Sequence, residues 1–192
     1  MKLSDLVKFA VLLFTTILAR LLQFFPNLEP IMPTMLPTAK RYGALAGFVF
    51  SFTAIASISF ITGTIGWFTL YTALAYALVG FFAGLYFKRF KRVGAKHYAG
   101  FAVAGILFYD IVTAGLFGVE FGQDLVLTYF AQIPFTAFHL LTVIPVVLLS
   151  PLIEKHFLEN KELDYAFEKF FRFTLLKHEE PAPSPVKRFE LD

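Results

Sequence analysis

The sequence predicts an all-α protein, a polytopic bundle of membrane-spanning helices followed by one amphipathic helix. The 192 residues are 57% hydrophobic and only 16% charged, whereas about a quarter of the residues in a typical soluble domain are charged. The charges are also unevenly placed, because residues 154–192 hold 16 of them and residues 1–153 hold only 15. So few charges cannot cover a soluble domain of that size. We therefore predict that lipid surrounds most of the chain.

Five apolar segments are long enough to cross a bilayer. About 18–20 residues, at about 1.5 Å per residue, cross the roughly 30 Å of hydrocarbon in a membrane. The first segment follows Lys2 and Lys8 and runs into Pro26 without a small-residue cleavage site, so we interpret it as a retained helix rather than a signal peptide. The five predicted spans are residues 6–25, 43–62, 66–87, 97–117 and 126–153.

The segment 26–42 carries four prolines among apolar residues, and it fits either a long loop or a short helix broken by proline. Lys and Arg are enriched in short loops on the cytoplasmic side of membrane proteins. If residues 28–39 cross the membrane, nine of the ten basic residues before residue 154 lie on the cytoplasmic side together with both termini. If they do not cross, Lys2 and Lys8 lie outside. We therefore favour six spans in the cell membrane, one of them short and broken by proline.

The last part of the chain has a different character. Residues 154–178 carry an apolar stripe at helical spacing with charges on the other faces, which is typical of an amphipathic helix on the inner face of a membrane. The same helix could instead dock on a cytoplasmic partner. The end of the chain is rich in proline and polar residues, as flexible extensions are. The predicted parts are a transmembrane bundle over 1–155, an amphipathic helix over 156–178 and a flexible tail over 179–192.

The sequence motifs that mark common classes of enzyme are mostly absent. There is no cysteine, which excludes disulfides, thiolate metal sites and cysteine nucleophiles. The sequence has no HExxH or GxSxG motif and no phosphate-binding glycine loop. Asp110 has no second acidic residue inside a span, so an aspartyl protease pair is excluded. Only His139 of the four histidines lies well inside a span. We expect no enzyme activity, no ATP hydrolysis, no metal and no cofactor.

Ionisable and polar residues inside the spans are the candidates for a binding site, because such groups are costly in a membrane and are often functional. Arg20 could hold an anionic group of a substrate, but it could equally reach the lipid headgroups or pair with Glu29. Asp110 could bind a ligand, or it could join two helices through a hydrogen bond with His139 or Tyr109. These alternatives stay open at the level of the sequence.

Under the six-span topology, several polar and aromatic residues lie at a similar depth toward the outside. Aromatic walls with a few orienting polar groups are what a small-molecule pocket needs. The residues predicted to bind a substrate are Arg20, Asn27, Glu29, Trp67, Tyr71, Tyr109, Asp110, Thr113, Gln132, Thr136 and His139.

Several short motifs occur in an order that is similar to one known family. A loop with the sequence NLEP follows the first span, and a KRYGALAG turn leads into a span rich in Gly and Ala. The segments GILFYDIVT and QIPFTAFH lie in the last two spans. With the length and the six-span plan, the chain resembles the S component, the substrate-binding membrane subunit, of energy-coupling factor (ECF) transporters. The matching segments are residues 27–30, 40–47, 66–69, 80–84, 105–113 and 132–139.

The resemblance implies a function and a set of partners. Such a subunit captures a vitamin or related micronutrient from outside and associates with a transmembrane coupling subunit and two ABC ATPases, which drive uptake. Many members contact the coupling subunit through small residues spaced by four on the first helix. This chain departs from that pattern, since it offers only Thr15-x-x-x-Ala19 and Ala10-x-x-x-Phe14. It also lacks the N-terminal histidine of the metal-binding members, which argues against nickel or cobalt.

Two other interpretations compete with the importer. A membrane scaffold similar to the rod-shape-determining membrane proteins would have the same architecture and would bind partner proteins rather than metabolites. The phenylalanine-rich helix over 156–178 would suit that role. A channel is disfavoured because no span has a continuous polar face. The scattered basic residues do not form the patch that a nucleic-acid-binding protein needs.

Overall fold

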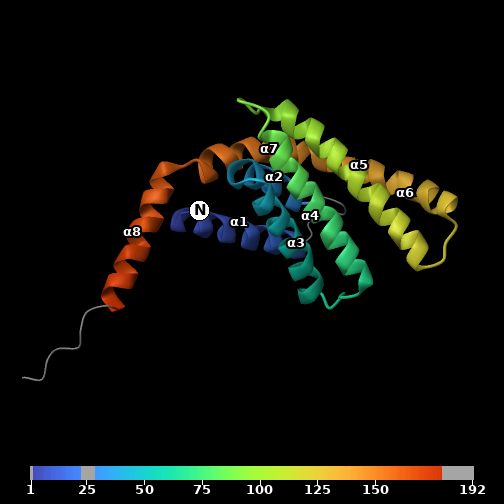
Figure 1. Cartoon of the computed structure of the whole chain (residues 1–192), viewed down its shortest axis with the longest axis horizontal. Coiled ribbons are helices and arrows are strands. Elements are labelled where there is room, and N and C mark those ends of the chain that lie inside the picture. Colours follow the sequence, from blue (N-terminus) through green and yellow to red (C-terminus); the bar gives the residue numbers. More distant parts are fainter. Residues whose placement is uncertain (1, 23–28, 179–192) are drawn as a thin grey trace, which may run out of the picture.

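The structure is a computed structural model that describes residues 2–22 and 29–178, with side chains described up to residue 171. The described residues form helices joined by short turns, and no strand occurs among them (Figure 1). The all-α prediction is therefore confirmed. The elements are α1 (Leu3–Leu22), α2 (Ile31–Tyr42), α3 (Ala44–Ile61), α4 (Trp67–Phe87), α5 (Ala95–Glu120), α6 (Leu125–His139), a 3-10 turn η1 (Leu140–Thr142), α7 (Val143–Ile153), a π turn η2 (Glu154–Leu158) and α8 (Lys161–His178).

Four helical stretches in the described part of the chain are long and apolar enough to cross a membrane. They are α3, α4, α5 and the 34-residue stretch Leu125–Leu158, which runs through α6, η1, α7 and η2. Two further helices do not meet that standard. Helix α1 carries Asp5, Lys8 and Arg20 among its 20 residues, and α2 has only 12 residues, about 18 Å of helix at about 1.5 Å per residue.

The outer surface of these helices is apolar. Large side chains such as Phe60, Phe130 and Ile144 are exposed, and α6 has a single buried residue, His139. A soluble protein rarely exposes apolar surface on this scale, and helices that are apolar all round belong in a core or in lipid. The structure is thus suited to a lipid bilayer, as the composition predicted.

Helix α2 forms the centre of the bundle, packed against α1, α3, α4 and α7. Its side chains at Met32, Met35, Leu36 and Ala39 are fully buried. Proline within a helix removes one backbone hydrogen bond, so Pro37 leaves the Pro33 carbonyl without its partner four residues on. The Ser150 hydroxyl of α7 donates to that carbonyl at 3.0 Å. A neighbouring helix therefore satisfies the group that the proline freed, as a bilayer requires.

Glycine lets α3 and α4 approach closely along the bundle. Gly47 and Gly80 lie so near each other that a Cβ on either residue would overlap the carbonyl oxygen of the other. One turn further along α4, Gly84 packs in the same way against Ala44. Small residues spaced by four, Gly80 and Gly84, thus bring the backbone of α4 against the backbone of α3.

The C-terminal helix is attached to the first helix by a buried lysine. The Lys8 ammonium is fully buried, donates to the carbonyl oxygens of Leu158 and Asn160 at 3.2 and 2.9 Å and pairs with Asp164 at 2.7 Å. Figure 1 shows α8 turning away from the direction of α7 beside the N-terminal end of α1. Leu158, the last residue of η2, is also fully buried.

We predict that Gly80→Ala destabilises the bundle by about 1–3 kcal/mol, because overpacking at a close helix contact forces the backbones apart. Gly100→Ala in α5 is the matched control, since nothing lies within 4 Å of the Cβ it would add. That change should be neutral or raise stability by up to about 1 kcal/mol through helix propensity. Thermal unfolding in detergent, followed by circular dichroism, measures both variants. Equal midpoints for the two would contradict the close contact.

Candidate binding site

Two adjoining cavities lie among the helices. The large cavity, of about 400 Å³, opens between α4, α5 and α6. The small cavity, of about 80 Å³, lies deeper, where α1, α2, α3 and α4 meet α5 and α6. Tyr109 and Phe135 line both, so these two rings mark the passage from one to the other. The small cavity is lined by Arg20, Glu29, Ile55, Tyr76, Tyr109, Phe135 and His139.

A buried carboxylate lies at one side of the small cavity. Glu29, just before α2, accepts a hydrogen bond from the Ile31 backbone N–H at 3.3 Å and another from the Tyr76 hydroxyl. A negative charge is stabilised at a helix N-terminus because the first N–H groups and the helix dipole point toward it. The start of α2 thus holds Glu29 in place beside the guanidinium of Arg20, which lines the same cavity.

A histidine–aspartate pair forms the opposite side. His139 Nδ1 lies 2.8 Å from Asp110 Oδ1, and the two side chains are only 7% and 1% exposed. A carboxylate oxygen accepts, so Nδ1 carries the hydrogen and Nε2 is directed elsewhere. Of the two sequence alternatives for Asp110, the hydrogen bond to His139 is confirmed.

Two atoms of this pair lack a partner within the described part of the chain: His139 Nε2 and Asp110 Oδ2. Both are buried, and buried polar atoms in proteins nearly always have a hydrogen-bond partner. Leaving such an atom unsatisfied costs about 1–3 kcal/mol. His139 lines the small cavity, so one of these two unpaired atoms belongs to a residue of the cavity wall.

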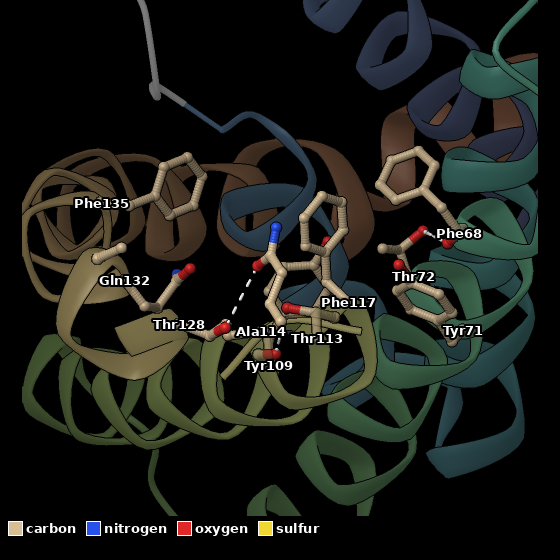
Figure 2. Close-up of a pocket in the computed structure, with 12 residues that line it drawn as sticks. Phe68, Tyr71, Thr72, Tyr109, Thr113, Ala114, Phe117, Thr128, Gln132 and Phe135 are labelled. Atoms are coloured by element: carbon tan, nitrogen blue, oxygen red, sulfur yellow. Dashed lines mark hydrogen bonds between the residues drawn. The ribbon is translucent and has the colours of Figure 1, made fainter. Parts of the chain in front are cut away.

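The large cavity has aromatic walls with a few polar groups. Figure 2 shows Phe68, Tyr71 and Thr72 of α4 on one side, Gln132 and Phe135 of α6 on the other, and residues of α5 between them. The Thr72 and Thr113 hydroxyls donate to carbonyls of their own helices at 2.7 and 2.8 Å. Their remaining lone pairs are available as acceptors. No residue in the described part of the chain that lines this cavity is charged.

The structure brings most of the predicted site residues together. Tyr71, Thr113 and Gln132 line the large cavity, Arg20, Glu29 and His139 line the small one, and Tyr109 lines both. Asp110 is hydrogen-bonded to His139. Thr136 accepts a hydrogen bond from Gln132 at 3.3 Å. Asn27 lies outside the described residues.

Trp67 is a correction. It was predicted to line the pocket because of its depth toward the outside of the membrane. The structure leaves it 77% exposed, and it lines neither cavity. Trp67 is the first residue of α4, where the helix has no neighbour over it, and the next residue, Phe68, takes the position at the cavity wall.

Sequence reasoning missed Tyr76, which holds Glu29, and the phenylalanines of the large cavity. A signal for Tyr76 existed, because a hydroxyl in the middle of an apolar span needs a hydrogen-bond partner. The phenylalanines gave none, since the chain has 26 of them and many face lipid. Within the described ranges, no three His, Asp or Glu side chains gather as metal ligands would.

Comparison with known proteins adds no family to this geometry. No protein-family model, no curated protein and no solved structure matches the chain. The function has to be argued from the cavities themselves.

We predict that Asp110→Leu and His139→Leu each lower stability by about 1–3 kcal/mol, because each leaves the other member of the pair buried without its partner. The double variant should lose clearly less than the sum of the two, since it removes both polar groups together. Unfolding of the wild type and the three variants in detergent measures the coupling. Strictly additive losses would show that the two side chains do not interact.

Proposed function

We propose that this protein is the substrate-binding integral membrane subunit of an ECF-type ABC importer, which captures a vitamin or related micronutrient from outside. One observation carries the proposal: His139 Nε2 and Asp110 Oδ2 are buried without a partner among the described residues, and His139 lines a cavity that adjoins a larger aromatic one. Small-molecule sites have typical volumes of about 300–1,000 Å³, aromatic walls and a few converging polar groups.

The groups at the site favour binding over catalysis. The His139–Asp110 pair resembles two members of a hydrolytic triad, but no Ser or Thr hydroxyl of the described residues lines the small cavity. A histidine base needs a nucleophile within hydrogen-bond reach. The carboxylate of Glu29 is engaged by Tyr76 and by the backbone of Ile31. Such fixed groups orient a ligand.

The proposed topology has six spans with both termini in the cytoplasm. The ends of α2 and α4 and the start of α5 carry Lys40, Arg41 and the basic residues of 88–96, and basic residues favour the cytoplasmic side. Segments 68–72 and 109–117, which line the large cavity, belong to the opposite halves of their helices. The cavities then open toward the outside, where a scarce nutrient is met.

The proposed partners are a transmembrane coupling subunit and two ABC ATPases. The chain lacks a phosphate-binding loop of its own, so the energy for uptake has to come from other proteins. The competing proposal, a membrane scaffold, draws on α8, where Tyr165 and Phe170 are exposed and would suit a protein partner.

We predict that the purified protein carries a stoichiometric small molecule, because high-affinity binders retain their ligand through purification. Native mass spectrometry in detergent, followed by organic extraction, detects and identifies it. His139→Leu should lose the ligand, whereas His156→Leu should keep it, since His156 is exposed in the π turn. A wild-type protein that is well folded and empty would favour the scaffold instead.

The topology has its own test. Because the chain contains no cysteine, single cysteines report cleanly on the side of the membrane. We predict that Thr64→Cys and Leu125→Cys react with a membrane-impermeant maleimide added to intact cells, and that Lys91→Cys reacts only after the membrane is opened. Labelling of Lys91→Cys in intact cells would exclude the proposed orientation.

A further inference from the structure

We infer that the ligand has two chemically different parts: an uncharged flat ring system that lies in the large cavity, and a head with N–H donors that binds Glu29 and His139 in the small cavity. This inference rests on the proposed binding function and specifies the class of substrate.

The small cavity offers hydrogen-bond acceptors to the head. The Glu29 carboxyl group accepts hydrogen bonds from Ile31 and Tyr76 and has lone pairs left after these two bonds. Because Asp110 Oδ1 accepts from Nδ1–H, an imidazole with its hydrogen on Nδ1 presents Nε2 as a second acceptor. An amine, which carries more than one N–H, has a donor for each of these two acceptors.

The charges at this site disfavour an anionic head. Among the described residues, Arg20 and His139 are the basic side chains that line the small cavity, Glu29 lines it as well, and Asp110 is hydrogen-bonded to His139. A phosphate or a pair of carboxylates on the ligand would place more than one negative charge opposite the single permanent positive charge of Arg20 and beside two buried acidic side chains. A neutral or cationic head avoids this excess of negative charge.

The large cavity suits an uncharged ring. None of the described side chains that line it is charged, so a charged substituent there would exchange water for mostly aromatic neighbours. The Tyr109 ring, packed edge-on against Tyr76 with centroids 4.9 Å apart, stands with Phe135 where the two cavities meet. An aromatic body can stack on such rings in an offset or edge-on geometry.

The test uses three compounds that share one ring and differ in the head. They are 2-(1-naphthyl)ethylamine, 2-(1-naphthyl)ethanol and 1-naphthylacetate, added to the full-length protein in detergent after any bound ligand has been extracted. Ligand-observed NMR or calorimetry measures their affinities. We expect the amine to bind at least about tenfold more tightly than the carboxylate, since one charge-assisted hydrogen bond accounts for such a ratio, with the alcohol between them.

Glu29→Gln should reduce the preference for the amine several-fold, because it replaces an acceptor oxygen with an N–H donor and keeps the shape of the side chain. Glu162→Gln is the control, since Glu162 is exposed on α8, away from both cavities, and the preference should not change. The preference of the wild-type protein is measured without any substitution, so the inference stays testable even where Glu29→Gln fails to fold.

The outcomes separate the two proposals. Tighter binding of the carboxylate, or an extracted natural ligand that has no N–H donor, would overturn the inferred class of ligand and leave the binding function standing. A folded wild-type protein that holds no ligand and binds none of the three compounds would overturn the binding function itself.

Discussion

A helix buried on all sides, α2, must have its polar groups satisfied by protein, and the rest of the bundle is arranged around that need. The carboxylate of Glu29 meets the first N–H groups of the helix, Ser150 donates to the carbonyl that Pro37 leaves free, and Lys40 at the far end pairs with Glu154. In hydrocarbon no water can replace these partners, and each unsatisfied group costs several kcal/mol. Helices α1, α3, α4 and α7 hold α2 between them.

The need to pair buried polar groups also distinguishes the candidate site from the rest of the bundle. The described chain completes the hydrogen bonding of most buried polar side chains, through local bonds such as those of Thr16 and Ser51 or through pairs such as Tyr98 with Glu154. His139 Nε2 and Asp110 Oδ2 have no hydrogen-bond partner among the described residues. His139 lines the small cavity, and Asp110 lies behind it. The Tyr71 hydroxyl, in a residue that lines the large cavity, also has no hydrogen-bond partner among the described residues, and neither has the Tyr42 hydroxyl, away from both cavities. Under the proposed function, a bound molecule would complete the hydrogen bonding of the unpaired groups at the cavities.

Some of the site was accessible to prediction, because intramembrane polar residues are rare enough to stand out. Asp110 and His139 were selected on that ground, and their hydrogen bond was one of the alternatives considered. Tyr71, Thr113 and Gln132 followed from their depth in the predicted spans. Trp67 failed because depth alone does not say which way a side chain at a helix end points, and that depends on whether a neighbouring helix covers it.

The sequence by itself determined that the chain is suited to a lipid environment, that it is helical, and approximately where the long helices begin and end. These depend on composition and on runs of apolar residues, which act locally and need no partner to be recognised. The tertiary structure decided which helix lies at the centre. It also decided that the Ser150 hydroxyl donates to the carbonyl that Pro37 leaves free, and that Tyr76 and Glu29, 47 positions apart in the sequence, form a hydrogen bond. Contacts of this kind depend on the packing of helices against one another. The spacing of residues along one helix does not show which other helix packs against it.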